Sequence, residues 1–595
     1  MSKKLALILL VLAGPVACQE DSPSTDPPAS WGVPISGGTM TISHDGHTAI
    51  VADPDRDRVL EVDLDAGKIV QEVQLAGDEP GRVLEDTMGR VHVVGRRGGV
   101  VVTLKSATDA TILARRSVCA EPRGIAYQAT SDSILVACTN GDLVTLPAAG
   151  GAETRRVFVD TDLRDVVVTA TATFVSRFKT AELIQLDDAG AVAMRWQTAA
   201  VQRLTDTGPV PAIGAVAWRT IALADGSIVM SHQRQDQTIL MTTHGGYGGN
   251  CGAPVESAVS LLPPGGVVAT AGLLDTVTPP VGDALPVDLA INATGNTLAF
   301  VGAGAGDIIT TDSSILHTTD GGGCDGGMID GPAGPSGGAF NTGTTINDQL
   351  GIPTSVAFDS AGDVVAFYPE LPGIVVHAAT PRTIWLTGDT GYDSGRAMFH
   401  TQTAVGLACA SCHPEGRDDG LVWQFVDEGT RRTQVPAGHI LERAPYHWAG
   451  DMKDLPTLMD NVFSVRMAGG DPTHSELVSL GPWLERIPAP HGPANDPADA
   501  VARGKTLFES SATQCSTCHT GELMTNSLAF DVGTGGKFKV PSLLGVGYRA
   551  PYLHDGCAPT LADRFGPCGG GDQHGKTSQL SPADVSDLVA YLNSL

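Results

Sequence analysis

Two pentapeptides of the pattern Cys-x-x-Cys-His lie near the C-terminal end of the 595-residue chain, at Cys409–His413 and at Cys515–His519. Two thiols three residues apart reach both vinyl groups of one haem and form thioethers, and the adjacent His lies beneath the iron as its proximal ligand. A chain with 11 Cys and 16 His would contain about 0.005 such motifs by chance. The sequence therefore predicts two covalently bound haem c groups. Their attachment residues are Cys409, Cys412 and His413 in the first haem motif, and Cys515, Cys518 and His519 in the second.

Zinc and thiol redox chemistry are the alternatives for the same cysteines. A zinc site needs four ligands, which Cys-x-x-Cys pairs can supply, and a thioredoxin-like site needs a βαβ setting. Both motifs carry the His and the chain carries an export signal, so covalent haem is the interpretation we adopt.

The segment that holds the motifs contains an internal repeat, which predicts two tandem domains of about 100 residues. Helical patterns begin at Asp389, and the border between the halves falls near Pro490. We expect two all-α domains of the class I cytochrome c type, at 389–490 and 491–595, and a fragment starting near Asp389 that folds and binds both haems. Besides the haem motifs, the matching segments are Ser394–Phe399 with Arg503–Phe508, Val435-Pro436 with Val540-Pro541, Ala444–Tyr446 with Ala550–Tyr552, and Pro482–Leu484 with Ala590–Leu592.

These halves resemble the bacterial dihaem cytochrome c peroxidase and MauG family. The resemblance covers about residues 389–595 and not the preceding part of the chain. It rests on Lys539–Leu543 followed by Ala550–Gly556 in the second half, and on Arg432–Pro436 and His447–Asp451 in the first.

The resemblance implies a reaction and several partners. It implies Trp448 as an electron relay between the haems, calcium between the two haem domains, hydrogen peroxide as a substrate and a small cytochrome as redox partner. An alternative role for Trp448 is a buried aromatic that fills the domain interface. The acidic stretch of the family's peroxidases, Gly-Pro-Ile…Glu-Met, has no counterpart here, and no residues for calcium are identified.

Distal iron ligands are predicted in each half. His574 replaces the Met or Tyr that the family places after its Tyr–aromatic–His-Asp-Gly motif, with a surface-loop His as the alternative. In the first half, the repeat aligns Phe463–Gly470 with Phe565–Gly571, which makes Met467 the candidate, with core packing as its alternative. His439 and His447 compete with Met467. His554 is expected beside the second haem without binding the iron.

The first two thirds of the chain predict a β-propeller. Residues 36–388 repeat a β-rich run, a polar turn and a second β-rich run, with an early period of about 40–45 residues, which is typical of a four-stranded blade. Seven units predict a seven-bladed β-propeller and resemble bacterial YVTN/NHL-like propellers, with a pair of β-sandwiches as the alternative. The turns lie at Asp45-Gly46, Asp86–Gly89, Ser131-Asp132, Ala172, Asp225-Gly226, Thr294-Gly295 and Ala361-Gly362.

The N-terminus predicts export. Lys3 and Lys4 precede the apolar run Leu5–Leu12, and Cys18 follows Ala17 as at a bacterial lipoprotein processing site. We expect a signal peptide at 1–18, a linker at 19–35, and a periplasmic or cell-surface protein anchored to the membrane only by lipid on Cys18. Cleavage near Ala17 without lipid is the alternative. The formal net charge of −28 argues against nucleic-acid binding.

Six cysteines remain once Cys18 and the four haem cysteines are set aside, and six is an even number, as disulfides in an oxidising compartment require. Cys119 with Cys138 and Cys557 with Cys568 are close in sequence. Cys251 and Cys324 form the third pair of this hypothesis.

Two functions compete. One is a dihaem peroxidase in which one iron opens a coordination site for hydrogen peroxide. The other is an electron-transfer or interaction protein whose haems stay six-coordinate and whose propeller docks a partner. We predict a dihaem c-type cytochrome of the peroxidase type, with electron transfer as its better-supported role.

Overall fold

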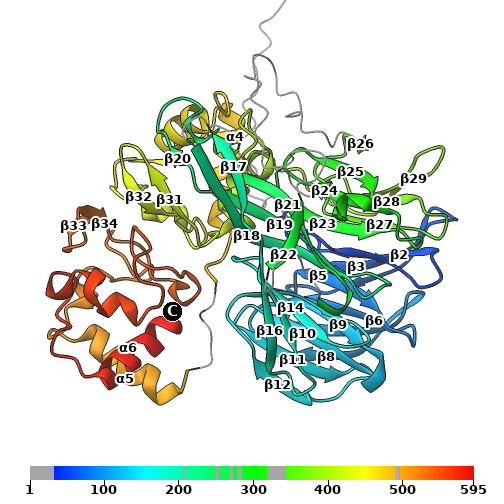
Figure 1. Ribbon diagram of the computed structural model, residues 1–595, viewed down its shortest axis with the longest axis horizontal. Coiled ribbons are helices and arrows are strands. Elements are labelled where there is room, and N and C mark those ends of the chain that lie inside the picture. The colour runs from blue at the N-terminus through cyan, green and yellow to red at the C-terminus, as the bar shows by residue number, and fades with distance from the viewer. Residues whose placement is uncertain are drawn as a thin grey trace, which may run out of the picture.

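The computed structural model describes residues 32–205, 208–248, 253–266, 273–277, 284–317, 344–490, 492 and 496–595. The expected signal peptide, Cys18, most of the linker and the cysteines of the third disulfide, Cys251 and Cys324, lie outside these residues. A large strand-rich part and a smaller helix-containing part lie side by side (Figure 1). Within the described ranges, no helix has the length and apolarity that crossing a membrane requires.

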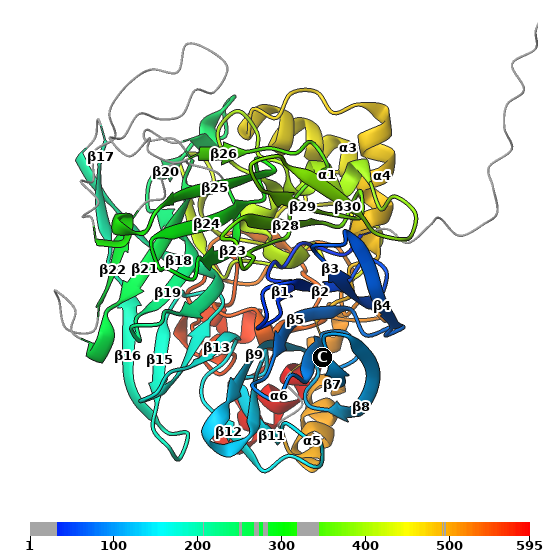
Figure 2. The ribbon, with the colours of Figure 1, turned by 90° about the vertical axis from the view of Figure 1, so that its right-hand side faces the viewer.

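Four-stranded antiparallel sheets build most of the strand-rich part, each from strands consecutive in the chain (Figure 2). Alternating short β-branched runs and polar turns favour such meanders. The sheets consist of β1 (Met40–Ile42), β2 (Thr48–Asp53), β3 (Arg58–Asp63) and β4 (Lys68–Gln74); β5 (Pro80–Glu85), β6 (Val91–Gly95), β7 (Val100–Ser106) and β8 (Asp109–Ser117); β9 (Pro122–Gln128), β10 (Ser133–Cys138), β11 (Asp142–Pro147) and β12 (Arg155–Phe158); β23 (Pro286–Ile291), β24 (Thr297–Gly302), β25 (Asp307–Asp312) and β26 (Thr344–Ile346); and β27 (Ser355–Phe358), β28 (Val364–Tyr368), β29 (Gly373–His377) and β30 (Arg382–Trp385).

A nine-stranded sheet joins two further groups of strands through a parallel pairing of β16 with β22. Its order along the sheet is β13-β14-β15-β16-β22-β21-β19-β18-β17. The strands are β13 (Leu163–Val168), β14 (Thr173–Arg177), β15 (Leu183–Leu186), β16 (Val192–Thr198), β17 (Val201–Thr205), β18 (Gly208–Ala222), β19 (Ile228–Asp236), β21 (Val255–Leu262) and β22 (Leu273–Val277).

The sheets close into a ring. Contacts run from β1 to β5, β9, β13, β18, β23 and β27 in turn, and β27 returns to β1. Apolar clusters fill the space between neighbouring sheets, such as the cluster of Val51 and Leu60 with Val365 and Phe367. Radial closure of this kind protects strand edges, and the strand-rich part is a β-propeller.

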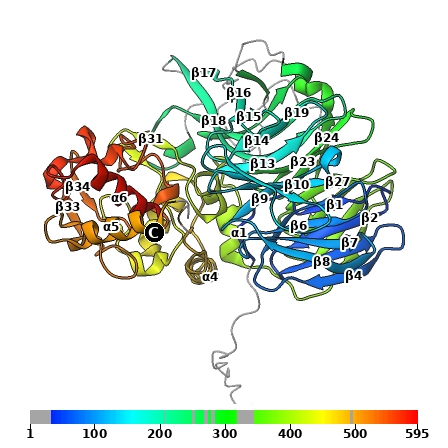
Figure 3. The same cartoon turned by 90° about the horizontal axis from the view of Figure 1, so that it is seen from below.

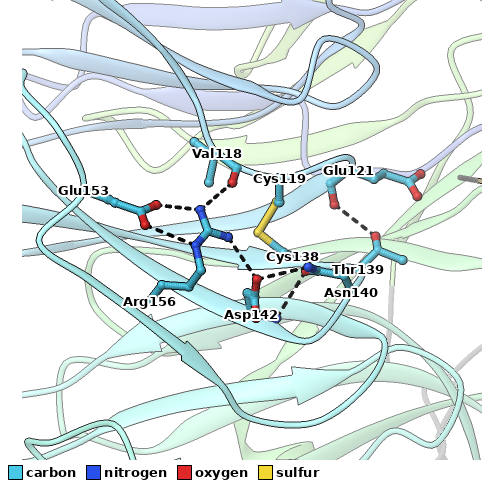
Figure 4. The surroundings of a disulfide bond; sticks show 9 residues. All are labelled: Val118, Cys119, Glu121, Cys138, Thr139, Asn140, Asp142, Glu153 and Arg156. Carbon is cyan, nitrogen blue, oxygen red and sulfur yellow. Dashed lines mark hydrogen bonds and ion pairs between the residues drawn. A yellow bond between two sulfur atoms is a disulfide. The ribbon is translucent and has the colours of Figure 1, made fainter. Parts of the chain in front are cut away.

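Two of the three expected disulfides lie in the described residues and are confirmed. Cys119 and Cys138 join the start of β9 to the end of β10, and Cys557 pairs with Cys568. Around the first bond, Arg156 donates to Asp142 at 2.9 Å and to the carbonyl of Val118 at 2.7 Å (Figure 4).

The helices follow the propeller, and two packed pairs dominate: α1 packs on α4, and α5 on α6. Polar caps begin several of them, since Asp393 accepts from the first turn of α1, and Thr473 and Ser581 form capping boxes on α4 and α6. The helices are α1 (Ser394–His400), α2 (Cys409–Cys412), α3 (Leu455–Leu458), a π-helical turn (Met459–Arg466), α4 (His474–Glu485), α5 (Ala498–Glu509) and α6 (Pro582–Asn593).

The expectation of all-α haem domains is wrong, because each half contains a β-hairpin. Strands β31 (Val422–Phe425) and β32 (Gly429–Arg432) pair in the first half, and β33 (Ala529–Asp531) and β34 (Lys537–Lys539) in the second. The propeller strand β20 (Ile239–Leu240) extends the first hairpin in parallel. Backbone groups of an exposed strand edge accept such a partner readily.

The first helical half also shares a hydrophobic core with the propeller. Phe399 and Trp483 belong to the same buried cluster as Val287 and Val356 of the sheets, and Trp483 Nε1 donates to the carbonyl of Gly32 at 2.8 Å. Figure 3 shows this yellow region between the propeller and the red C-terminal segment. A fragment that starts near Asp389 would therefore expose part of this core, contrary to the expectation that it folds by itself.

Candidate haem sites

The first haem motif lies on the one-turn helix α2 and the residue after it. His413 is half-buried, and its Nδ1 lies 3.1 Å from the carbonyl oxygen of Arg417. Burial lowers the pKa of His413, so the ring is held neutral, as an iron ligand must be. Cys409 and Cys412 form no disulfide. The arrangement fits a haem held by two thioethers and one imidazole.

The second haem motif repeats this geometry. The His519 Nδ1 lies 3.2 Å from the carbonyl oxygen of Met524, and burial lowers the pKa of His519 to about 4. Cys515 and Cys518 are also unpaired. Among the described residues, no cluster of three or more metal-ligating side chains includes any of these cysteines, which argues against zinc.

His574 faces His519 across the second site. The two ring centroids are 6.5 Å apart with planes tilted by 34°. A metal–imidazole bond is about 2 Å long, so two rings on opposite sides of one metal have centroids about 6 Å apart. The His574 Nδ1 lies 3.3 Å from the carbonyl oxygen of Gly569, and burial lowers the His574 pKa to about 3. Both rings are thus oriented through Nδ1, and their separation fits two imidazoles on one metal.

Met467 is buried at the first site, next to Cys409 and Cys412 in one apolar cluster. Its two competitors have other partners. His439 is exposed and bonds Glu485 at 2.9 Å, and His447 lies between Asp451 at 3.1 Å and Glu428 at 3.4 Å. Met467 is therefore the predicted ligand whose side chain has no competing polar partner among the described residues.

Trp448 lies at the contact between the two halves. Its Nε1 donates to the carbonyl of Arg432 at 2.7 Å, and its own carbonyl accepts from the backbone of Lys539 at 2.9 Å. Its ring is 6.3 Å from that of His554, which stacks on Phe538 at 3.8 Å. This position of Trp448 is compatible with both roles considered for it, an electron relay and an aromatic side chain that fills the domain interface.

One continuous cavity of about 510 Å³ touches both haem motifs. Its lining is mostly apolar and includes Met467, His574, Trp448 and His554 from the predicted set. The two haem motifs therefore border neighbouring parts of one cavity, as electron exchange between two haems would require.

Buried cations at this cavity support an anionic occupant. Burial lowers the pKa of Arg443 to about 10, of Arg549 to about 9 and of Lys539 to about 8. Each donates to backbone carbonyls, and none forms an ion pair with a carboxylate of the described residues. Buried charges normally have partners, and the propionates of a haem would supply them.

Sequence reasoning missed these cations and also Tyr247. A signal for the former was present, because Arg443 and Arg549 each precede the repeated Ala-Pro-Tyr segment. Tyr247 comes from the propeller, lines the cavity and accepts from Arg466 at 3.2 Å. No local pattern predicts a contact across more than 200 residues.

The comparisons with known proteins identify the C-terminal part. Residues 501–595 match the family model Cytochrome c, so this part is a cytochrome c domain, of the family that binds haem c covalently and transfers electrons. The hydrazine synthase subunit gamma of Kuenenia stuttgartiensis is 26% identical over 255 residues, which covers 32% of this chain and 72% of the relative. The cytochrome-c peroxidase IdrP1 of Denitromonas iodatirespirans is 42% identical over 67 residues, 10% of this chain and 18% of the relative.

Solved structures give looser likenesses. A chain of Kuenenia stuttgartiensis hydrazine synthase aligns over 62% of this chain and all of its own length, with 15% identity and a TM-score of 0.45. A streptogramin B lyase aligns over 57% of this chain and 92% of its own, with 13% identity and a TM-score of 0.38. The propeller is therefore assigned from the strand order of its sheets and from the ring of contacts between them.

Proposed function

We propose that this protein is an exported dihaem c-type cytochrome of the cytochrome c peroxidase type, with a seven-bladed propeller followed by two tandem cytochrome c domains. The observation that carries the proposal is the duplicated site: two Cys-x-x-Cys-His motifs open on one cavity, each with its His held through Nδ1 by a backbone carbonyl. The seven innermost strands that contact one another in a ring support seven blades.

The ligand sets of the two sites differ. Haem supplies one-electron redox chemistry when bound. At the second site His519 and His574 would hold the haem iron, and the ring separation of 6.5 Å supports this assignment. At the first site His413 and Met467 would hold the iron, and a thioether ligand would raise the potential of that haem relative to one held by two imidazoles. Trp448 fills the contact between the two halves and serves as the relay.

Electron transfer to a redox partner, such as a small cytochrome, is the primary function. A second candidate is the reduction of hydrogen peroxide at the first site, favoured by a polar network beside Met467. Arg466 joins the Tyr247 hydroxyl at 3.2 Å to Glu428 at 2.7 Å, and His447 lies 3.4 Å from the other Glu428 oxygen. In this second candidate function, the Glu428 carboxylate moves the proton that peroxide cleavage requires.

Steady-state peroxide reduction tests the choice. The full-length holoprotein is assayed with a reduced small cytochrome as donor, before and after one-electron pre-reduction, with Glu428→Gln as the matched variant. Turnover that Glu428→Gln lowers by about 10²-fold or more supports peroxidase chemistry at the first site. If neither state shows turnover and both haems stay low-spin, peroxide reduction is excluded and electron transfer remains as the function.

Export and anchoring at Cys18 belong to the same proposal. They rest on the signal-like N-terminus and on the two disulfides, which favour an oxidising compartment. Cys18→Ala should move the protein from the membrane fraction to the soluble periplasmic fraction, and an unchanged distribution would contradict the lipid anchor. Calcium stays a family expectation, since the metal-ligating cluster found in the described residues, His439, Glu442 and Glu485, is largely exposed.

A further inference from the structure

Glu415 follows the first haem motif by two residues and points its carboxylate into the propeller. The side chain is buried and forms ion pairs with three guanidinium groups: Arg164 at 2.6 Å, Arg96 at 3.1 Å and Arg123 at 3.2 Å. The backbone at Glu415 has a φ of +55°, which L-residues rarely adopt without support from their surroundings. The loop after the first haem motif is thus tied to the propeller by the charged side chain of Glu415.

The three arginines come from three successive sheets. Arg123 is in β9, Arg164 is in β13 and Arg96 directly follows β6. Each is fixed by a second contact, Arg123 to Asp162 at 2.9 Å, Arg164 to the carbonyl of Trp218 at 3.1 Å and Arg96 to Glu79 at 3.5 Å. Since β9 and β13 belong to the inner ring of strands, Glu415 lies where neighbouring blades converge.

A second contact with the propeller involves Arg417, whose carbonyl oxygen is the hydrogen-bond partner of His413. The Arg417 carbonyl oxygen is the partner of His413 Nδ1 at 3.1 Å. The guanidinium of the same Arg417 donates to Glu121 of the propeller at 2.7 Å. His413 therefore lies immediately before a loop whose two charged side chains, at 415 and 417, both end in the propeller.

We propose that Glu415 and the Arg417–Glu121 pair are positioning residues through which the propeller orients His413 and sets the reduction potential of the first haem. This inference rests on the proposed function, because it takes His413 as a haem ligand. The arginines are balanced by Glu415, so removing its charge leaves uncompensated positive charge beside the first site. Positive charge favours the reduced haem, which carries one electron more.

Glu415→Gln and Glu121→Gln in the full-length holoprotein test the inference. Glu121→Gln changes a propeller residue nearly 300 positions before the haem motif. The matched control is Glu182→Gln, which removes another propeller carboxylate held by two arginines, Arg177 at 3.2 Å and Arg195 at 2.9 Å. The measurement is a spectroelectrochemical titration that resolves the two haems.

We expect an upward shift for the first haem only, by roughly a tenfold change in its reduced-to-oxidised ratio at fixed potential. The second haem and the Glu182→Gln protein should titrate as wild type. Unchanged potentials in both variants, or equal shifts of both haems, overturn the inference. If Glu415→Gln does not fold, Glu121→Gln decides alone. A wild-type protein without haem on the first motif would instead refute the proposed function.

Discussion

At the scale of single residues, the proposed second haem site contains two imidazoles, each oriented by a backbone carbonyl. His519 and His574 each direct Nδ1 to a backbone carbonyl, so the ring orientation is fixed before any metal binds. A histidine at position 574 that only occupied a surface loop would not have to face His519 at a ring separation of 6.5 Å.

Replacing His574 by Ala tests this residue directly. Loss of the sixth ligand should convert the second haem, one of two, from low-spin to high-spin and let it bind carbon monoxide when reduced. Optical and electron paramagnetic resonance spectra measure both changes. The control is His439→Ala, since His439 is exposed and bonded to Glu485. A His574→Ala protein whose haems both stay low-spin would refute the assignment.

His400 makes a prediction about acid stability. It is buried where α1 meets the propeller; its Nδ1 lies 2.9 Å from the carbonyl of Arg396, and its Nε2 accepts from the Ile35 amide at 3.2 Å. Burial lowers the pKa of His400 from 6.5 to about 3. The unfolded chain therefore binds a proton that the folded one excludes, and the stability fully present above pH 6.5 is lost as the pH falls toward 3.

His400→Gln keeps a donor and an acceptor without the titration. Between pH 6.5 and 4 the wild type should lose up to about 1.4 kcal/mol per pH unit more than the variant, in denaturant unfolding of the full chain. His474→Gln, at an exposed position on α4, should show the wild-type slope. Parallel curves for wild type and His400→Gln would contradict this account.

At the scale of elements, the sequence predicts what depends on local chemistry. The haem motifs, the Ala-Pro-Tyr repeats and the short strands between polar turns are readable because spacing alone determines them. The pairing of β20 with β31, the approach of Tyr247 and the burial of Glu415 are not readable, because each joins residues far apart in the chain. The two hairpins were missed since their strands are only three or four residues long.

The two helical halves should differ in independence. The core around Phe508 and Leu588 contains only residues from 501–595, whereas the core around Phe399 and Trp483 continues into the propeller. We expect fragment 496–595 to fold with one haem, and fragment 389–595 to aggregate or to carry haem only on the second motif. Haem content and gel filtration of the two fragments measure this. A soluble 389–595 fragment with two low-spin haems would show that the propeller is dispensable.

At the scale of the whole molecule, the propeller contributes to the cavity at the first haem motif. Leu240, Tyr247 and Pro254 line the cavity from the propeller side, and Lys179 joins both halves by donating to Asp418 at 2.9 Å and to the carbonyl of Tyr548 at 2.7 Å.

Intact-mass analysis of the full-length protein after acid–acetone extraction tests the central claim most directly. Thioether bonds survive this treatment, so the mass should exceed that of the apoprotein by two haems, with one haem on each peptide that contains Cys409 and Cys412 or Cys515 and Cys518. Alanine at the two cysteines of either motif should remove one haem and leave the other. A mass equal to the apoprotein, haem released into the solvent, or zinc bound to these cysteines would contradict the account.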